Sequence, residues 1–183
     1  MMVSFLMVNE LPPLYVWHLH ECDPHKCTSI KLKKHGFVKF IPSLKYANKS
    51  SIILNPLSNK VLSVTDRSIV EKWGLVVIDC SWKDTTILDK FKNISMGRRL
   101  PLFFAANPTN YAKPYILSSV EAFASALIII RKLDLAVRLL SLFKWGETFL
   151  SLNKLLIDSY LKARDEFEIR RVEEEFYQHY VIK

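Results

Sequence analysis

A short apolar run, Leu75–Ile78, constrains the fold more strongly than any other feature of the sequence. Gly74 precedes it directly, and the polar residue Asp79 follows it. A strand with apolar side chains on both of its faces is typical of a parallel sheet that is covered by other layers. The chain is therefore expected to contain a parallel β-sheet in which this segment is a buried strand.

The rest of the first half alternates between strand-like and helix-like segments. A short helix is predicted to begin at the cap Ser63-Val-Thr-Asp66, to run through Lys72 and to end at Gly74. Further strands are predicted at Leu14–Leu19, Ser51–Leu54 and Leu100–Ala106. This alternation indicates an α/β layer with crossover connections.

The second half of the chain is predicted to be mainly helical. Ser118 and Glu121 have the spacing of a capping box, in which each side chain bonds the backbone near the other. Helices are expected at 122–130, at Leu133–Phe143, from Trp145 or Gly146 to Tyr160, and at Glu166–Tyr180. The predicted organisation is an α/β domain at 1–100 and a mostly helical domain at 101–183.

The net charge of +8 is distributed unevenly. Residues 1–100 contain 15 lysines and arginines against 8 acidic residues, whereas residues 101–183 contain 11 against 10. No acidic residue occurs between Asp23 and Asp66, a stretch that contains eight lysines. Such a cluster favours a polyanionic partner. Nucleic acid is preferred to a membrane because these lysines are not expected to form a stripe on an amphipathic helix.

Several classes of protein are disfavoured by what the sequence lacks. The most apolar segment, 124–130, is too short to span a membrane, and the first residues lack the basic region of a signal peptide. Together with three cysteines that lack framework spacing, this predicts a cytoplasmic protein. With only four glycines and no Gly-rich phosphate loop, a pyrophosphate cradle is disfavoured, but a nucleotide-like cofactor without phosphates is compatible.

Three polar clusters follow predicted strands, and ligands bind beyond the carboxyl ends of strands in a parallel sheet. The clusters are residues 18–28, 79–82 and 107–111, and they are expected to converge on one pocket. The first contains zinc-ligand residue types: His18, His20, Cys22, His25 and Cys27. Structural zinc sites usually combine two ligand pairs from separate segments, and no second pair is present. No metal is therefore predicted.

Six segments together resemble a known family, the small-subunit rRNA aminocarboxypropyltransferases, a SPOUT-like group that uses S-adenosylmethionine. They are His20–Thr28, Leu62–Asp66, Val77–Trp82, Arg99–Tyr111, Leu117–Ala122 and Phe143–Asn153. They occur in the family's order and cover the chain almost from end to end, and the DCSW and LP-x-x-x-AANP-x-NY motifs are the most specific. The chain departs from the family at Ser29 and Ala112, where glycine is usual, and at Thr109, where valine is common.

The resemblance implies an α/β fold with a SPOUT-like parallel sheet and a deep trefoil knot around the AANP loop, followed by an α-helical C-terminal half. It also implies transfer of the 3-amino-3-carboxypropyl group of S-adenosylmethionine to N3 of a (N1-methyl)pseudouridine in small-subunit rRNA, with release of methylthioadenosine. The partner would be the pre-ribosomal small subunit, and the enzyme would be a monomer. Two alternatives are a SPOUT-class rRNA methyltransferase, and a non-catalytic rRNA-binding ribosome assembly factor.

The resemblance and the chemistry together assign roles to individual residues. Asp79 is the candidate base for the N3 proton, with a cap or hydrogen-bond orienter as the alternative. Trp82 would hold the sulfonium by cation–π attraction and so aim the transferred group outward. Thr28 would bind the amino-acid end of the cofactor. Further cofactor contacts are expected at Ile78, Leu102, Tyr115 and Ser119. RNA contacts are expected at Lys26, Lys31, Lys33, Lys34, Arg98 and Arg99.

Overall fold

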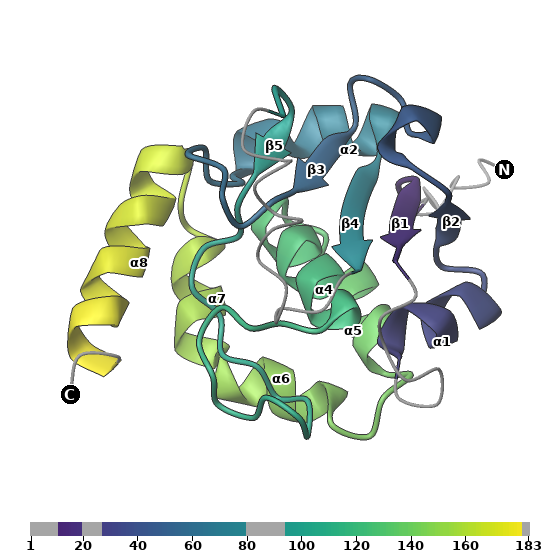
Figure 1. Cartoon of the computed structure of the whole chain (residues 1–183). Coiled ribbons are helices and arrows are strands. Elements are labelled where there is room, and N and C mark those ends of the chain that lie inside the picture. The colour runs from purple at the N-terminus through teal and green to yellow at the C-terminus, as the bar shows by residue number, and fades with distance from the viewer. Residues whose placement is uncertain (1–10, 20–26, 80–93, 181–183) are drawn as a thin grey trace, which may run out of the picture.

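The structure, a computed structural model, describes residues 11–19, 27–79 and 94–180 (Figure 1). Its sheet has five parallel strands in the order β2-β1-β4-β3-β5. The strands are β1 (Leu14–His18), β2 (Lys39–Ile41), β3 (Ile52–Leu54), β4 (Leu75–Asp79) and β5 (Gly97–Arg98). The parallel sheet that the apolar run predicted is confirmed, and that run forms most of the middle strand. β2 and β5 were not predicted.

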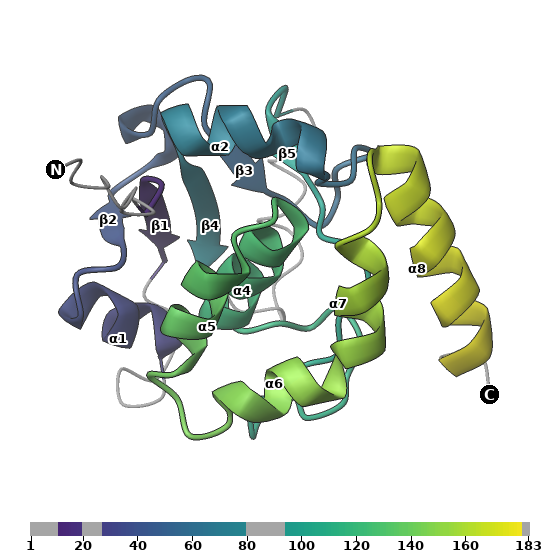
Figure 2. The ribbon, with the colours of Figure 1, turned by 180° about the vertical axis from the view of Figure 1, so that it is seen from behind.

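The middle strand is buried on both faces, as its sequence indicates. Leu75, Val76 and Val77 are all buried although successive side chains point to opposite sides. In the sheet, β4 pairs with β1 on one side and with β3 on the other, with Val16 opposite Val77. Figure 2 shows α4 (Ser119–Ile129) and α5 (Leu133–Leu140) lying over one face of this sheet.

The strand begins at a tight junction that requires glycine. The helix α2 (Arg67–Trp73) ends at Gly74, as predicted, and Gly74 has a φ of +94°. A Cβ atom at this position would lie 2.4 Å from the carbonyl oxygen of Pro13. Glycine therefore allows α2 to end directly against the segment that enters β1.

The helices of the second half match the prediction, with one break. Besides α4 and α5 they are α6 (Gly146–Leu152), α7 (Lys154–Tyr160) and α8 (Glu166–Tyr180). In the first half, α1 (Thr28–Lys34) and a 3-10 helix at Leu44–Tyr46 were not predicted, and a 3-10 helix at Val64–Asp66 directly precedes α2. The single helix expected up to Tyr160 is wrong, because Asn153 separates α6 from α7. The bounds predicted for α8 are confirmed, and Figure 1 shows it at the outer edge of the molecule beside α7.

The strand expected at Leu100–Ala106 is also wrong, and side chains explain why. This segment is extended, but its one β-bridge joins Phe104 to Pro114. The side chain of Asn153 accepts a hydrogen bond from the Phe104 N–H (2.7 Å) and donates to the Phe104 carbonyl (2.9 Å). The Tyr160 hydroxyl donates to the Leu102 carbonyl (3.1 Å). Side chains of the helical half thus satisfy backbone groups that a neighbouring strand would otherwise satisfy.

One hydrophobic core extends through the sheet and the helices. Phe103, Leu127, Phe149 and Tyr160 are almost completely inaccessible to solvent and join the strand residues in one cluster. Within the described ranges, no helix is both long enough and apolar enough to cross a lipid bilayer.

Candidate functional site

A cavity of about 1480 Å³ opens beyond the carboxyl end of β4. Ile78 and Asp79 line it at the end of that strand, and Thr28 lines it at the start of α1. Residues 107–110 and the start of α4 complete this part of the wall. The expected convergence is therefore observed in part: each of the three polar clusters contributes residues to the cavity, namely Cys27 and Thr28, Asp79, and residues 107–110. The cavity exceeds the 300–1000 Å³ that is common for a site holding one small ligand.

A buried carboxylate organises the part of the wall formed by the AANP loop. Glu121, in the first turn of α4, is completely buried. It accepts hydrogen bonds from the backbone N–H groups of Ala106 (2.7 Å) and Asn107 (3.0 Å). Its other oxygen accepts from the Asn107 side chain and from the N–H and hydroxyl of Ser118, each at 2.7 Å. The predicted capping box is confirmed, and it also fixes the loop against the helix.

Two helix starts meet at the pocket. The hydroxyl oxygen of Thr28 accepts a hydrogen bond from the Val120 N–H (3.4 Å), which joins the first residue of α1 to the first turn of α4. Ser119, the first residue of α4, directly precedes Val120 and lines the cavity. Thr28 and Ser119 are thus brought together although 91 positions separate them in the sequence.

Asp79 lies at the centre of a small polar cluster. The Ser29 hydroxyl donates a hydrogen bond to its Oδ2, and the Cys27 thiol donates to the same oxygen (3.5 Å). Nε2 of His18 lies 3.7 Å from that oxygen and 3.5 Å from the Cys27 sulfur. Ser29 is one of the positions named above as departures from the resemblance, and it contacts the candidate base directly.

The same cluster contains residue types that can bind a metal. Donor atoms of His18, Cys27 and Asp79 lie within 4.8 Å of one another. His18 and Cys27 belong to the set of zinc-ligand types considered above, and the other members, His20, Cys22 and His25, lie outside the described residues. Hydrogen bonds already join the three side chains, and the expectation that no metal binds remains a prediction.

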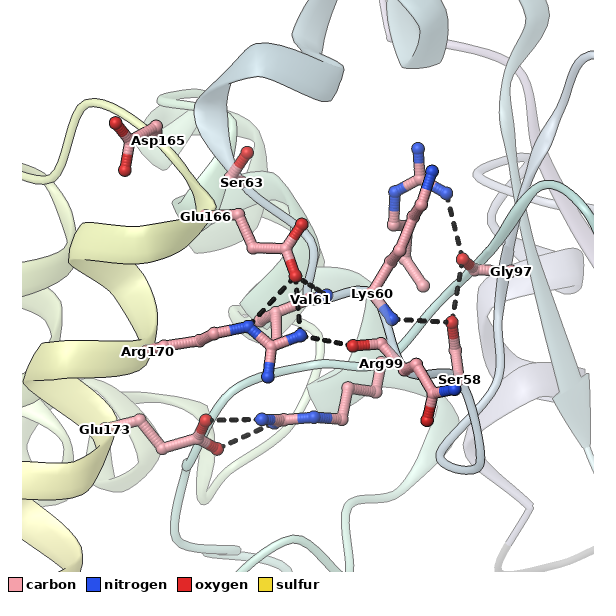
Figure 3. Close-up of polar contacts among 12 residues, drawn as sticks. Ser58, Lys60, Val61, Ser63, Gly97, Arg99, Asp165, Glu166, Arg170 and Glu173 are labelled. Carbon is pink, nitrogen blue, oxygen red and sulfur yellow. Dashed lines mark hydrogen bonds and ion pairs between the residues drawn. The ribbon is translucent and has the colours of Figure 1, made fainter.

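Side chains of α8 also line the cavity, and one of them, Glu173, pairs with Arg99 (Figure 3). Both oxygens of Glu173 pair with the guanidinium of Arg99, at 2.8 and 2.7 Å. This pairing raises the pKa of Arg99. The Tyr115 hydroxyl donates to the same carboxylate (3.2 Å). Burial and then the Glu173 charge raise the pKa of Tyr115 well above its ordinary value, so this phenol stays protonated.

Tyr115 adopts an unusual backbone conformation. Its φ is +63°, a region that costs a non-glycine residue energy and is found most often where a site requires it. Its N–H donates to the Phe103 carbonyl (3.0 Å), which fixes the backbone at the edge of the cavity. Glu173 therefore holds the side chain of a residue whose backbone is also constrained.

The first turn of α8 is anchored to the loop that follows β3 (Figure 3). Glu166 accepts a hydrogen bond from the Val61 N–H (3.0 Å) and pairs with Arg170 (2.6 Å). Arg170 also donates to the Asn59 carbonyl. Burial alone would raise the pKa of Glu166, but the Val61 N–H and the Arg170 guanidinium outweigh it and hold the pKa below its ordinary value.

The basic residues expected to bind RNA are placed in different surroundings. Lys31 and Lys34 line the cavity, and Lys33 lies over the Phe40 ring, 4.5 Å from its centroid. All three belong to α1, so the expectation that the lysines avoid a helical stripe is wrong for them. Arg98 is not among the residues that line the cavity, and it pairs with Asp66 (3.0 Å).

The predicted cofactor residues also differ in placement. Leu102 is completely buried, and its side chain does not line the cavity. Trp82 and Lys26 lie outside the described residues. The predicted residues that line the cavity are Thr28, Ile78, Asp79, Tyr115, Ser119, Lys31, Lys34 and Arg99.

Glu173, Phe143 and Trp145 also line the cavity and were not predicted. Glu173 was missed because it belongs to a run of three glutamates, of which Glu174 and Glu175 are exposed. The aromatic pair could have been found from Phe143–Asn153, one of the segments that carry the resemblance.

Comparisons with known proteins agree with this architecture. The family described as "Ribosome biogenesis protein, C-terminal" matches residues 52–177, and "Possible Fer4-like domain in RNase L inhibitor, RLI" matches residues 12–45. The "16S rRNA aminocarboxypropyltransferase" of Methanocaldococcus jannaschii is 40% identical over 91% of this chain and 96% of its own length. That of Vulcanisaeta distributa is 43% identical over 82% of each chain. A solved structure, the "SAM-dependent rRNA:acp-transferase Tsr3" from Vulcanisaeta distributa, matches with a TM-score of 0.81 and 41% identity, and 89% of each chain is covered.

Proposed function

The chain belongs to the 16S rRNA aminocarboxypropyltransferase family, and on this premise we propose that it transfers the 3-amino-3-carboxypropyl group of S-adenosylmethionine to small-subunit rRNA. The observation that carries the proposal is the cavity beyond β4, where Asp79, Thr28 and Ser119 converge from three separate segments. Its size leaves room for a nucleoside of the acceptor beside the cofactor.

The cofactor would occupy the part of the cavity between the sheet and the two helix starts. The Thr28 hydroxyl and the backbone at the start of α4 can meet the amino-acid end, and backbone groups near Ile78 and Tyr115 can bind the adenosine. Leu102 lies behind this wall, so its contribution would be through the backbone. Trp82 would face the sulfonium, as the family motif indicates.

The reaction is a displacement at the carbon γ of the methionine moiety. The bond between this carbon and sulfur breaks, its electrons return to sulfur, and methylthioadenosine leaves as a neutral thioether. The new bond forms to N3 of a (N1-methyl)pseudouridine, whose proton must be accepted by a base. Asp79 is suited to this step because its carboxylate lines the cavity and the Ser29 hydroxyl orients it.

The acceptor RNA would approach over α1, where Lys31, Lys33 and Lys34 are exposed. Lysines of this kind contact phosphates and position an RNA without reading its sequence. Arg99 forms an ion pair with Glu173, so a carboxylate of the protein already neutralises its charge. Arg98 is paired with Asp66 in the same way. The lysines of α1 are therefore the principal phosphate contacts proposed among the described residues.

Further expectations complete the proposal. The resemblance implies a SPOUT-like sheet with a deep trefoil knot around residues 105–108 and a monomeric state. The sequence pattern adds a cytoplasmic location, the absence of a bound metal, and a division between residues 100 and 101. Light scattering on the purified protein would measure its molar mass in solution and so test the monomeric state.

The role of Asp79 is tested by comparing Asp79→Asn with Asp134→Asn, which changes an exposed carboxylate on α5. The expected result is that Asp79→Asn binds S-adenosylmethionine with nearly normal affinity but loses most of its transfer rate, by about 100-fold or more. Asp134→Asn should behave as the wild type. Normal transfer by Asp79→Asn would exclude the base, and loss of cofactor binding instead would assign Asp79 to cofactor orientation.

A further inference from the structure

An aromatic pair lies on the wall of the cavity where α5 joins α6. The rings of Phe143 and Trp145 are 5.1 Å apart between centroids and are inclined by 37°. Both residues line the cavity, and both are only partly buried. Neither has a part in the cofactor contacts proposed above. Each therefore presents ring surface to a space that the proposed cofactor contacts do not account for.

The ammonium group of Lys31, on α1, lies over one ring of the aromatic pair. The ammonium group of Lys31 lies 4.8 Å from the centroid of the Phe143 ring and donates a hydrogen bond to the Leu142 carbonyl (2.5 Å). Lys34 and His35 line the cavity on the same side of the molecule as Lys31. The aromatic surface is thus adjacent to the basic helix over which the RNA is proposed to approach.

Hydrogen bonds fix the backbone of the turn that carries the two rings. The Phe143 N–H donates to the Leu140 carbonyl (2.9 Å), and the Gly146 N–H donates to the Phe143 carbonyl (2.9 Å). A Cβ atom on residue 146 would lie 2.0 Å from the Leu140 carbonyl oxygen, so only glycine allows this close turn. A ring carried on a fixed backbone loses less conformational entropy when a ligand stacks on it.

From these observations we infer that Phe143 and Trp145 form a stacking site for an unpaired nucleobase of the acceptor RNA. The inference rests on the proposed function and adds to it the site where the base to be modified, or the base next to it, is held. N3 of a pyrimidine is on its pairing edge, so the reacting base cannot be paired when it is modified. Enzymes that act on a base hold it unstacked from its neighbours, commonly against aromatic side chains.

The alternative is that the two rings only cover the core. Both contact the main hydrophobic cluster, and this packing accounts for their buried edges. It does not account for their exposed surface in the cavity or for the lysine placed over Phe143. Fully buried aromatic residues of the same core, such as Phe103 and Phe149, have no such surface.

The test separates stacking on a base from contacts with phosphates. The probe is an RNA hairpin with a single N1-methylpseudouridine in its loop, compared with the same hairpin carrying an abasic site there. The variants are Phe143→Leu and Trp145→Leu, which keep apolar volume but remove the ring, with Trp145→Phe to restore a ring. Phe167→Leu is the control, because Phe167 is exposed on α8 and does not line the cavity.

For the wild type, removal of the base should weaken binding by roughly 5- to 150-fold, the range expected for stacking of one base on an aromatic ring. In Trp145→Leu or Phe143→Leu, the intact hairpin should bind as weakly as the abasic one. Trp145→Phe should recover most of the affinity, and Phe167→Leu should match the wild type. S-adenosylmethionine affinity should stay constant in all of them, which shows that the cavity is intact.

An equal loss of affinity for both hairpins, or no loss for either, would overturn the stacking site. A variant that also loses S-adenosylmethionine binding would place its ring in the cofactor site or the core, and that too would overturn the assignment. The proposed function is checked separately by release of methylthioadenosine from the wild type. A wild type that releases methylthioadenosine but shows no difference between the hairpins refutes only the stacking site. A wild type that distinguishes the two hairpins but releases no methylthioadenosine would refute only the transfer reaction.

Discussion

Replacing Glu173 with alanine tests how much α8 contributes to the site and to the fold. The Glu173 side chain is 9% exposed, and it balances Arg99, which is 24% exposed, while it also accepts from Tyr115. Removing one partner of a buried ion pair costs about 3–5 kcal/mol, because the other charge is left unpaired. Since the guanidinium of Arg99 keeps some access to water, a loss of about 2–3 kcal/mol is expected. For a chain of this size, that loss corresponds to a decrease in Tm of about 4–12 °C.

The measurement is thermal or urea unfolding of Glu173→Ala beside Glu175→Ala, the matched control. Glu175 is an exposed glutamate on the same helix, and its replacement should leave the Tm almost unchanged. Arg99→Met and the double variant complete a cycle, in which the coupling between the two side chains should be at least about 1 kcal/mol. Equal effects of Glu173→Ala and Glu175→Ala, or additive effects in the cycle, would refute the account of Glu173 as a buried partner.

Four further predictions follow from individual contacts. The folded-state pKa of Glu166 lies below its ordinary value of 4.5, so its stabilising effect is complete above that pH and is lost as the pH falls through the folded pKa. Urea unfolding should therefore show Glu166→Gln to be less stable than the wild type at neutral pH, with a difference that shrinks as the pH falls below 4.5; a constant difference would contradict this. Ala112 has a φ of +61°, so Ala112→Gly should raise the free energy of unfolding by about 0.5–1 kcal/mol, whereas Ala122→Gly inside α4 should lower it. Lys34→Gln should reduce the slope of log affinity for RNA against log salt by about 0.7–0.9, whereas Lys154→Gln, on the exposed surface of α7, should leave it unchanged. Dialysis against EDTA should leave transfer activity intact and elemental analysis should find no stoichiometric metal; zinc at one equivalent, lost together with activity, would instead place a metal at His18, Cys27 and Asp79.

The parts of the fold that local pattern determines could be predicted from the sequence. The run at 75–78 predicted a buried parallel strand because only a covered sheet accepts apolar side chains on both faces. The capping box of Ser118 and Glu121 fixed the start of α4, and the α8 bounds followed from periodicity. The convergence of polar segments at the strand ends followed from the geometry of parallel sheets.

The parts that depend on distant side chains could not be predicted. The sequence around Asn153 reads as continuous helix, but the helix is interrupted at Asn153, whose side chain bonds the distant backbone of Phe104. The same bonds explain why residues 100–106 need no neighbouring strand. Glu173 looked like one solvated glutamate among three, because its partner Arg99 is 74 residues away. The knot and the roles of Asp79 and Trp82 rest on the resemblance, the division into domains rests on the change of pattern near residue 100, and all of these stay predictions.

The central claim, transfer of the aminocarboxypropyl group and not of the methyl group, is tested most directly by the nucleoside product. The protein would be incubated with S-adenosylmethionine and small-subunit rRNA, both unmodified and carrying N1-methylpseudouridine, and the product identified by mass spectrometry. The account predicts methylthioadenosine, released only when RNA is present. RNA-dependent release of S-adenosylhomocysteine would contradict it and would identify a methyltransferase. Failure to release either product with both RNAs would also contradict it and would favour a non-catalytic assembly factor.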